Sequence, residues 1–291
     1  MDLSIIIVSW KVKDLLQSCL KSIFEETENI SFEVILIDNA SQDGTVEMVR
    51  EKFPSVLLMG SKENLGFAKG NNIAIPGAKG RYVLLLNPDT FILDRALEKM
   101  ARFMDAHSEY DACGCKLLYP DGTLQESCRR FPGFWSQFFI LLKLHNFFPR
   151  WACIGKYYMK DFKYDEVCEV DQVMGACLMA RKGVFEKVGL LDEHFWAWFE
   201  EVDWCLRLKK TGGKLVFFPG AEIIHHKGQS FNQYWRRQWL FNTSMLTYFK
   251  KHHSFLSYTG IFILMPFNLL LDRLVALLLF LKIPIKKKKN L

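Results

Sequence analysis

Val34-Ile-Leu-Ile-Asp-Asn-Ala-Ser-Gln-Asp-Gly44 begins with an uninterrupted apolar, mostly β-branched run. An acidic loop that ends in glycine follows this run directly. An apolar run without polar alternation is typical of a strand buried on both faces of a sheet. Helical spacing of apolar residues follows over Gly44–Phe53, with Ser41 or Asp43 as the N-cap. The segment therefore predicts one strand-loop-helix unit of an α/β fold.

The same unit recurs on both sides of this segment. Strands are expected at Leu3–Val8, Glu33–Ile37, Val56–Met59 and Tyr82–Leu86, and helices at Asp14–Phe24, Gly44–Phe53 and after the turn at Asn64–Gly70. This alternation predicts a doubly wound, mostly parallel sheet flanked by helices. Ligands of such sheets bind at the carboxyl ends of the strands.

The second half of the chain is less regular. Further strands are expected at Asp171–Ala180 and Lys214–Phe218, with a helix at Glu200–Lys210 between them. An aromatic and aliphatic stretch, Phe134–Trp151, offers a patch that faces either a membrane or an acceptor lipid.

The charge of the 291-residue chain is unevenly distributed. Half of the residues are hydrophobic and 24% are charged, which excludes a disordered chain. The formal charge of +6 arises from the tail, because residues 250–291 contain eight Lys/Arg and one Asp, which leaves −1 for the first 249 residues. A basic, apolar tail favours a membrane surface and excludes a nucleic-acid partner.

The tail leaves three arrangements open. Tyr258–Leu281 is apolar except for Asp272 and Arg273, but Pro266 interrupts it and basic residues flank both ends at 250–251 and 286–289. Because basic flanks prefer the cytoplasmic side, a peripheral or monotopic helix pair on the cytoplasmic face of the cell membrane is expected. A single span and a soluble packing or dimer helix pair are the alternatives. A chain cut after Tyr248 is expected to be soluble. Scattered cysteines and the absence of a signal-peptide pattern indicate a reduced cytosolic protein.

Polar residues fall where the expected strands end. Asp38 and Asn39 follow one strand, and Asn87 and Asp89 follow another. A carboxylate at a strand end can accept the imide N–H of a pyrimidine base or cap a helix loop, and Asn87-Pro88-Asp89 can offer a metal ligand or form an ordinary turn. The loop Asn64–Asn71 lacks the G-x-G-x-x-G pattern, so a dinucleotide cofactor is not expected.

Acidic residues gather in an aromatic setting at Phe199-Glu-Glu-Val-Asp-Trp204. On a helix Glu200 and Asp203 share a face, and Glu201 points elsewhere. Desolvation among aromatic rings raises the proton affinity of a carboxylate and suits a general base. An ion pair of Asp203 with Arg207, four residues later, is the alternative.

Taken together, these segments resemble glycosyltransferase family 2, the GT-A fold, and within it the rhamnosyltransferase-like branch of bacterial cell-surface polysaccharide synthesis. The resemblance extends over roughly residues 3–248. The matching segments are Ser4–Trp10, Val34–Gly44, Asn64–Asn71, Leu86–Asp89, Asp121–Gln125, Gly175–Met179, Gly189–Glu193, Phe199–Arg207 and His225-His226.

The resemblance implies a role for each matching residue. Asp89 and His225 would hold a divalent cation, Mn²⁺ or Mg²⁺, and Glu201 would be the catalytic base, within an acidic set that includes Glu200 and Asp203. Asn87 replaces the first Asp of the family's D-x-D motif. Glu201 stands where Asp is usual, which leaves Glu200 open as the base. The residues expected to bind the nucleotide-sugar are Ser9, Asp38, Asn39, Asn64, Gly66, Phe67, Gly70, Asn71 and Asn87.

The activity implied is inverting transfer of a sugar, rhamnose from dTDP-rhamnose, to a lipid-linked or glycan acceptor. Trp198, Trp204, Arg129 and Arg130 are expected to bind the acceptor, although core packing of the tryptophans and a solvated arginine pair are alternatives. Residues 1–249 would form the glycosyltransferase domain, divided into a nucleotide-sugar half (1–110) and an acceptor half (111–249), and residues 250–291 the membrane-associating tail. A homodimer is possible. A processive polysaccharide synthase and an inactive glycan-binding or scaffold subunit are the competing functions.

Overall fold

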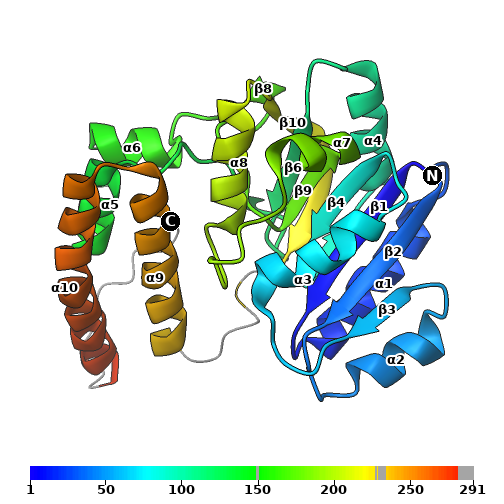
Figure 1. Cartoon of the computed structure of the whole chain (residues 1–291), viewed down its shortest axis with the longest axis horizontal. Coiled ribbons are helices and arrows are strands. Elements are labelled where there is room, and N and C mark those ends of the chain that lie inside the picture. Colours follow the sequence, from blue (N-terminus) through cyan, green and yellow to red (C-terminus); the bar gives the residue numbers. More distant parts are fainter. Residues whose placement is uncertain (149–150, 227, 229–233, 281–291) are drawn as a thin grey trace.

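The computed structural model describes residues 1–148, 151–226, 228 and 234–280 of the chain. The first half alternates strands and helices as the sequence predicts (Figure 1). Its elements are β1 (Leu3–Ser9), α1 (Lys13–Glu26), β2 (Phe32–Asp38), α2 (Thr45–Lys52), β3 (Leu57–Gly60), α3 (Gly66–Ala74), a 3₁₀ turn (Ile75–Gly77) and β4 (Tyr82–Leu86). Four strands pair in the order β3-β2-β1-β4, all parallel.

The second half completes a ten-stranded mixed sheet. Its elements are β5 (Thr90–Ile92), α4 (Ala96–Ala106), β6 (Ala112–Leu118), β7 (Leu124–Gln125), α5 (Phe134–Leu141), a 3₁₀ turn (Leu144–Asn146), α6 (Ala152–Tyr158), β8 (Cys168–Glu169), β9 (Cys177–Arg181), α7 (Lys182–Val188), α8 (Glu200–Lys210), β10 (Leu215–His225), α9 (Tyr234–His252) and α10 (Phe255–Phe280). The sheet continues from β4 through β9, β6, β10 and β5. The α/β class is confirmed.

The expectation of a mostly parallel sheet is wrong for this half. β9 lies antiparallel between β4 and β6, and β5, β7 and β8 also pair antiparallel, whereas β6 and β10 are parallel. A buried strand is a continuous apolar run in either direction. The direction is set by the connection, which the run itself does not encode.

Two expected strands have different bounds. The run at 171–180 forms a regular strand only from Cys177, and Gln172, Met174, Gly175 and Ala176 before it line a cavity. The strand expected to end at Phe218 continues to His225 through a register shift between Phe218 and Glu222. Pro219-Gly220 therefore forms an irregularity within β10 and does not end it.

Each face of the sheet is covered by its own helices. Helices α1, α2 and α4 pack on the face that carries Ile5, Ile7 and Leu84. The opposite face carries Ile6, Val8 and Leu85 and is covered by α3, α7 and α8. This period-2 alternation in strands that are buried on both sides gives the three-layer arrangement visible in Figure 1.

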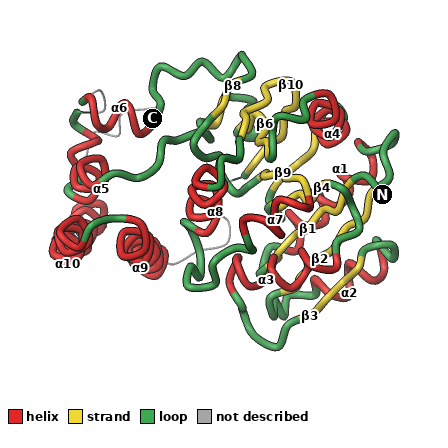
Figure 2. Tube along the Cα trace, turned by 45° about the horizontal axis from the view of Figure 1, so that its top comes forward, coloured by secondary structure: helices red, strands yellow, loops and turns green. Residues whose placement is uncertain are grey.

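Helices α5, α9 and α10 lie together beside the sheet body, and Figure 2 shows them nearly end-on. They share a third apolar cluster with the start of α8. This cluster includes Phe199, Tyr248 and Phe249. The α9 helix runs to His252, across the domain boundary expected at residue 249.

The α10 helix forms hydrogen bonds on its inner side through Asn268. The Nδ2 of Asn268 donates to Leu141 O in α5 (2.8 Å), and Asn242 Nδ2 in α9 donates to Asn268 Oδ1 (2.9 Å). Within the described part of the chain, no helix has the combined length and hydropathy of a membrane span. The basic flank at 286–289 and Lys282 lie outside the described residues.

Candidate active site

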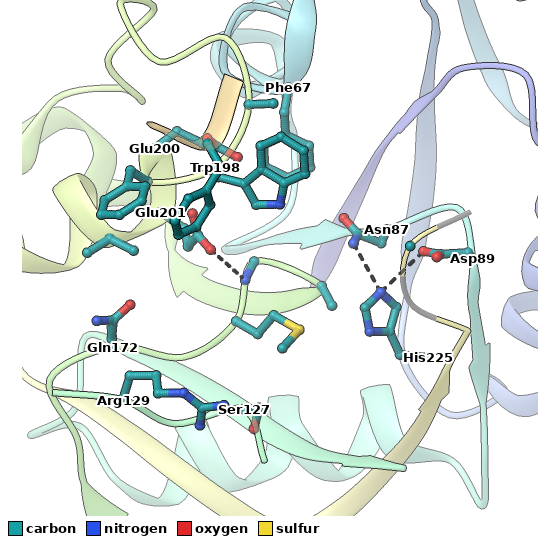
Figure 3. A pocket seen from close by; sticks show the side chains of 18 of the residues that line it. Phe67, Asn87, Asp89, Ser127, Arg129, Gln172, Trp198, Glu200, Glu201 and His225 are labelled. Carbon is teal, nitrogen blue, oxygen red and sulfur yellow. Dashed lines mark hydrogen bonds and ion pairs between the residues drawn. The ribbon is translucent and has the colours of Figure 1, made fainter. Parts of the chain in front are cut away.

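A cavity of about 380 Å³ lies where the carboxyl ends of the strands meet the start of α8. Several segments that are distant in sequence form its walls. The lining residues include Val8, Phe67, Asn87, Asp89, Ser127, Arg129, Tyr157, Gln172, Gly175, Trp198, Glu200, Glu201, His225, Arg237 and Phe241. Figure 3 shows the glutamates on one side and Asn87, Asp89 and His225 on another.

One end of the cavity is formed by Asp89 and His225. Both side chains are buried, and His225 Nε2 lies 3.3 Å from Asp89 Oδ1. The other ring nitrogen, Nδ1, lies 2.7 Å from Gln125 Oε1. An amide oxygen accepts only, so Nδ1 donates to Gln125, and Nε2 is the ring nitrogen that is directed at Asp89. The Nδ2 of Asn87 also approaches Nε2, at 3.3 Å.

This donor set fits a divalent cation. A ring nitrogen fixed by a hydrogen bond on its far side and a carboxylate beside it are typical of metal ligands. Among the described residues no group of three or more His, Cys, Asp or Glu gathers around one point. Oxygen atoms of a diphosphate or water would therefore supply the remaining ligands of such an ion.

The other end contains two adjacent carboxylates at the start of α8. Glu200 is 5% exposed, and burial, followed by the charge of Glu201, holds its pKa well above the ordinary value. Burial also raises the pKa of Glu201, while the N–H of Gly175 donates to Glu201 Oε1 (3.4 Å) and favours its charged form. One oxygen of each carboxylate, Oε2, has no hydrogen-bond partner.

The expectation that Glu201 points away from Glu200 is wrong for their side chains, which line the same cavity. Both glutamates line the cavity, because it lies at the N-terminal end of α8 and not along one side. Asp203 is fully buried away from the cavity, where Arg207 Nε donates to its Oδ2 (2.8 Å). The ion-pair alternative is thus the correct one for Asp203.

Only two of the nine residues predicted to bind the nucleotide-sugar belong to the lining of this cavity. Phe67 and Asn87 line it. Four others have a buried side-chain oxygen without a partner: Ser9 Oγ, Asp38 Oδ1, Asn39 Oδ1 and Asn71 Oδ1. Ser9 and Asp38 are direct neighbours at the ends of β1 and β2. Unpaired buried oxygens are costly, so this group is suited to a ligand that donates hydrogen bonds.

The remaining three predicted residues, Asn64, Gly66 and Gly70, lie just before α3 and within it. The side chain of Asn64 accepts from the N–H of Gly66 (2.9 Å). Gly66 has φ +78°, and a Cβ there would lie 2.4 Å from Trp196 O. A Cβ on Gly70 would lie 2.8 Å from Val8 Cγ1, so this glycine lets α3 approach β1.

The structure divides the predicted acceptor residues into two pairs. Trp198 and Arg129 line the cavity. Trp204 is fully buried in the core, and its Nε1 donates to Gly189 O (3.0 Å), so it cannot stack on a sugar. Arg130 lines a separate, smaller cavity with Asp171 and Lys209, because consecutive side chains of an extended segment point in opposite directions.

Several residues that line the cavity, or that contact a residue lining it, carried no assignment from the sequence. Gln125 orients His225. The segment that contains Gln125 matched the family pattern, but this match gave the residue no role. Ser127 has a buried Oγ without a partner, and Arg237 and Phe241 reach the cavity from α9. No local pattern marks residues that come together only through the packing of α9.

Comparison with known proteins gives a consistent result. The family model described as glycosyl transferase family 2 matches residues 4–189. The chain is 30% identical over 243 residues to the N-acetylglucosaminyl-diphospho-decaprenol L-rhamnosyltransferase of Mycobacterium tuberculosis, covering 78% of this chain and 77% of the relative. It is 25% identical over 239 residues to the rhamnosyltransferase WbbL of Escherichia coli, covering 78% and 85%.

Solved structures share the fold at low sequence identity. The mannosyltransferase PcManGT of Pyrobaculum calidifontis, in complex with GDP-Man and Mn²⁺, has a TM-score of 0.57 at 16% identity, with 92% of this chain and 71% of that chain covered. TarS of S. aureus has a TM-score of 0.58 at 15% identity, covering 90% and 42%.

Proposed function

The chain belongs to glycosyl transferase family 2, and from this membership we propose that it transfers a sugar from a nucleotide-sugar to a hydroxyl group of a lipid-linked or polysaccharide acceptor. The observation that carries the proposal is the shared cavity, in which Glu200 and Glu201 face Asp89 and His225 (Figure 3). These two ends supply the two requirements of the reaction, a base for the acceptor and ligands near the leaving diphosphate.

The donor is dTDP-rhamnose in this proposal. Two relatives are named as rhamnosyltransferases, which supports rhamnose as the sugar. The unpaired oxygen of Asp38, at the end of β2, is suited to accept the imide N–H of a thymine base. Asn39, Asn71 and Ser9 offer further acceptors for base and ribose groups.

Glu201 acts as the base and Glu200 stays protonated. Two buried carboxylates side by side cannot both ionise at low cost, so one of them retains a proton. Glu201 accepts the N–H of Gly175 and is less deeply buried than Glu200, so we assign the negative charge to it. Its carboxylate takes the proton of the acceptor hydroxyl, and the oxygen attacks the anomeric carbon from the face opposite the diphosphate, with inversion.

Asp89 and His225 would hold a divalent cation in the same proposal. A cation bound there neutralises charge on the leaving nucleoside diphosphate. Gln125 keeps the His225 ring in the orientation and tautomer that present Nε2 to the cavity. Arg129 and Trp198 lie on the cavity wall and are the acceptor residues that remain.

The acceptor also bears on where the protein works. The relative from M. tuberculosis is named for a diphospho-decaprenol substrate, which supports a lipid-linked acceptor. The outer side of α10 is apolar and exposed, for example 55% at Phe262 and 61% at Leu270. A peripheral or monotopic position on the cytoplasmic face of the membrane, through this helix and the basic tail, is part of the proposal. A homodimer stays a prediction.

The test uses the full-length chain with dTDP-rhamnose and Mn²⁺ or Mg²⁺, and measures release of the nucleoside diphosphate. Glu201→Gln and Asp89→Ala are expected to lower kcat by about 10²–10⁴-fold, because each removes a group that acts in the transition state. Glu47→Gln, an exposed carboxylate on α2, is the control and should retain full activity.

Two outcomes would contradict the proposal. Turnover of the Glu201 and Asp89 variants at the wild-type rate would refute the site. Absence of turnover and of thermal stabilisation with dTDP-sugars and UDP-sugars would refute the function, since a bound donor raises the melting temperature by mass action.

A further inference from the structure

The backbone just before the two glutamates has an unusual conformation. Trp198 and Phe199 are consecutive non-glycine residues with φ of +62° and +70°. Left-handed conformations are unfavourable at such residues and persist only where surrounding contacts enforce them. Because Glu200 and Glu201 follow directly, whatever holds this turn also sets where their carboxylates lie.

A hydroxyl group of α9 holds the N-terminal side of the turn. Ser244 is 4% exposed, and its Oγ donates to Ala197 O at 2.7 Å. From the other side, the N–H of Phe67 in α3 donates to Trp196 O (3.1 Å). The carbonyl groups of two successive residues before the turn are thus bonded to two different helices.

The turn itself packs against aromatic side chains of α9. The ring of Phe199 lies 5.3 Å from that of Phe241 and 5.6 Å from that of Tyr248, measured between centroids. Phe199 and Tyr248 are buried, so these contacts leave the ring little room to move.

Two polar side chains near the end of α9 hold the C-terminal side of the turn. Lys251 Nζ and His252 Nε2 each lie 2.7 Å from Asp203 Oδ1, and Arg207 of α8 occupies Oδ2. Asp203 in turn donates its N–H to Phe199 O (2.8 Å). The α9 helix therefore contacts α8 and its preceding turn before, at and after the two glutamates.

We propose that Ser244 is a positioning residue for Glu201, and that α9 braces the left-handed turn from which α8 presents its glutamates. The effect on catalysis rests on the proposed function, whereas the bracing of the turn by α9 concerns the backbone alone. Ser244 does not touch the cavity contents; it acts through Ala197. Loss of its hydroxyl removes the hydrogen bond to the Ala197 carbonyl and lets the turn relax toward ordinary φ values.

The kinetic test compares three variants on α9, again with dTDP-rhamnose and Mn²⁺. Ser244→Ala is expected to lower kcat by about 10- to 100-fold, because a shift of about 1 Å in a reacting group can cost that much. The KM for the donor should stay within about twofold, since the donor residues lie on β1, β2 and the start of α3. Ser244→Thr keeps the hydroxyl and should restore most of kcat.

Thr243→Val is the matched control. The hydroxyl of Thr243 donates to Leu240 O (2.9 Å), inside α9 itself, so its loss leaves the turn untouched. If Ser244→Ala does not fold, Lys251→Met replaces it, because Asp203 keeps Arg207 and His252. This variant should lower kcat several-fold at unchanged KM.

Hydrogen exchange measured by mass spectrometry supplies a readout that needs no substrate. Amides of residues 196–204 should exchange faster in Ser244→Ala than in wild type and Thr243→Val. If the wild type turns over no donor, the proposed function fails and the exchange result alone decides the brace. Unchanged exchange in this segment, or an equal fall in kcat in Ser244→Ala and Thr243→Val, would overturn it.

Discussion

Glu200 and Glu201 differ by one position in the chain and are assigned opposite protonation states. The difference arises from the N–H of Gly175, which reaches Glu201, and from the deeper burial of Glu200. Chemistry at the site thus depends on a backbone amide that comes from residues 172–176, a segment expected to be a strand.

Substitution of Glu200 by Gln is expected to stabilise the protein at neutral and higher pH. A carboxyl group whose pKa is raised on folding contributes stability below its unfolded pKa, and this contribution is lost as pH rises through the folded pKa. Each unit of elevation corresponds to ~1.4 kcal/mol. Thermal melts from pH 5 to pH 8.5 should therefore show the variant gaining in Tm over the wild type as pH rises.

Glu201→Gln is the companion variant for these melts. The charged form of Glu201 accepts the N–H of Gly175, and Glu201 is less deeply buried than Glu200, so its gain in Tm should be smaller. Parallel Tm profiles for Glu200→Gln and the wild type would show that burial does not shift the proton affinity of Glu200.

At the scale of elements, α9 belongs to the catalytic body and not to a detachable tail. Phe249 and Tyr248 are buried in the cluster shared with α8, and Lys251 and His252 both contact the carboxylate of Asp203, which has no exposed surface. A cut after Tyr248 would remove Lys251 and His252, and with them two of the three side chains that contact this carboxylate.

A chain truncated after Tyr248 is expected to be unstable, in contrast to the soluble protein that charge and hydropathy predict. Removal of one partner of a buried ion pair costs about 3–5 kcal/mol, and loss of Phe249 and Ile261 from the cluster adds to this. Circular dichroism melts and gel filtration should show a lower Tm or aggregation. A chain ending at residue 280 is the control and should melt like the full protein; an unchanged Tm for the shorter chain would refute the structural role of α9.

At the scale of the whole molecule, the two sides of α10 differ in character. The inner side carries the buried amide of Asn268, which accepts a hydrogen bond from Asn242 of α9, whereas the outer side exposes Leu256, Phe262 and Ile263. Helical spacing places these outer residues on one stripe. The basic residues of 250–291 add electrostatic attraction to anionic lipid.

The full chain is expected to co-sediment with vesicles that contain anionic lipid, and less so with neutral vesicles or at high salt. Replacing Phe262 and Ile263 by Ser should weaken binding, because it removes apolar area from the stripe. Leu57→Ser with Met59→Ser is the matched control, since β3 exposes both side chains far along the sheet from α10. Equal binding of the two double variants would rule out α10 as the docking surface.

The sequence by itself determined the βα units of the first half, the helix at Glu200–Lys210 and the family. These features are local, because hydrophobic period and the residues at strand ends are set by consecutive positions. Val34–Asp38 and Asn87–Asp89 could be interpreted without knowledge of the rest of the chain. The same locality explains why the extent of β10 was misjudged at Pro219-Gly220, where a dipeptide typical of turns forms a bulge.

Only the tertiary structure decided the direction of β9, the separation of Arg129 from Arg130, the burial of Asp203 and Trp204, and the contact of Gly175 with Glu201. Each of these depends on which segments meet across long distances in the chain, as when α9 closes on the turn before α8 some 47 residues earlier. Periodicity constrains which face of an element is apolar, but the partner of that face, and the polar groups that meet there, follow from packing the whole chain at once.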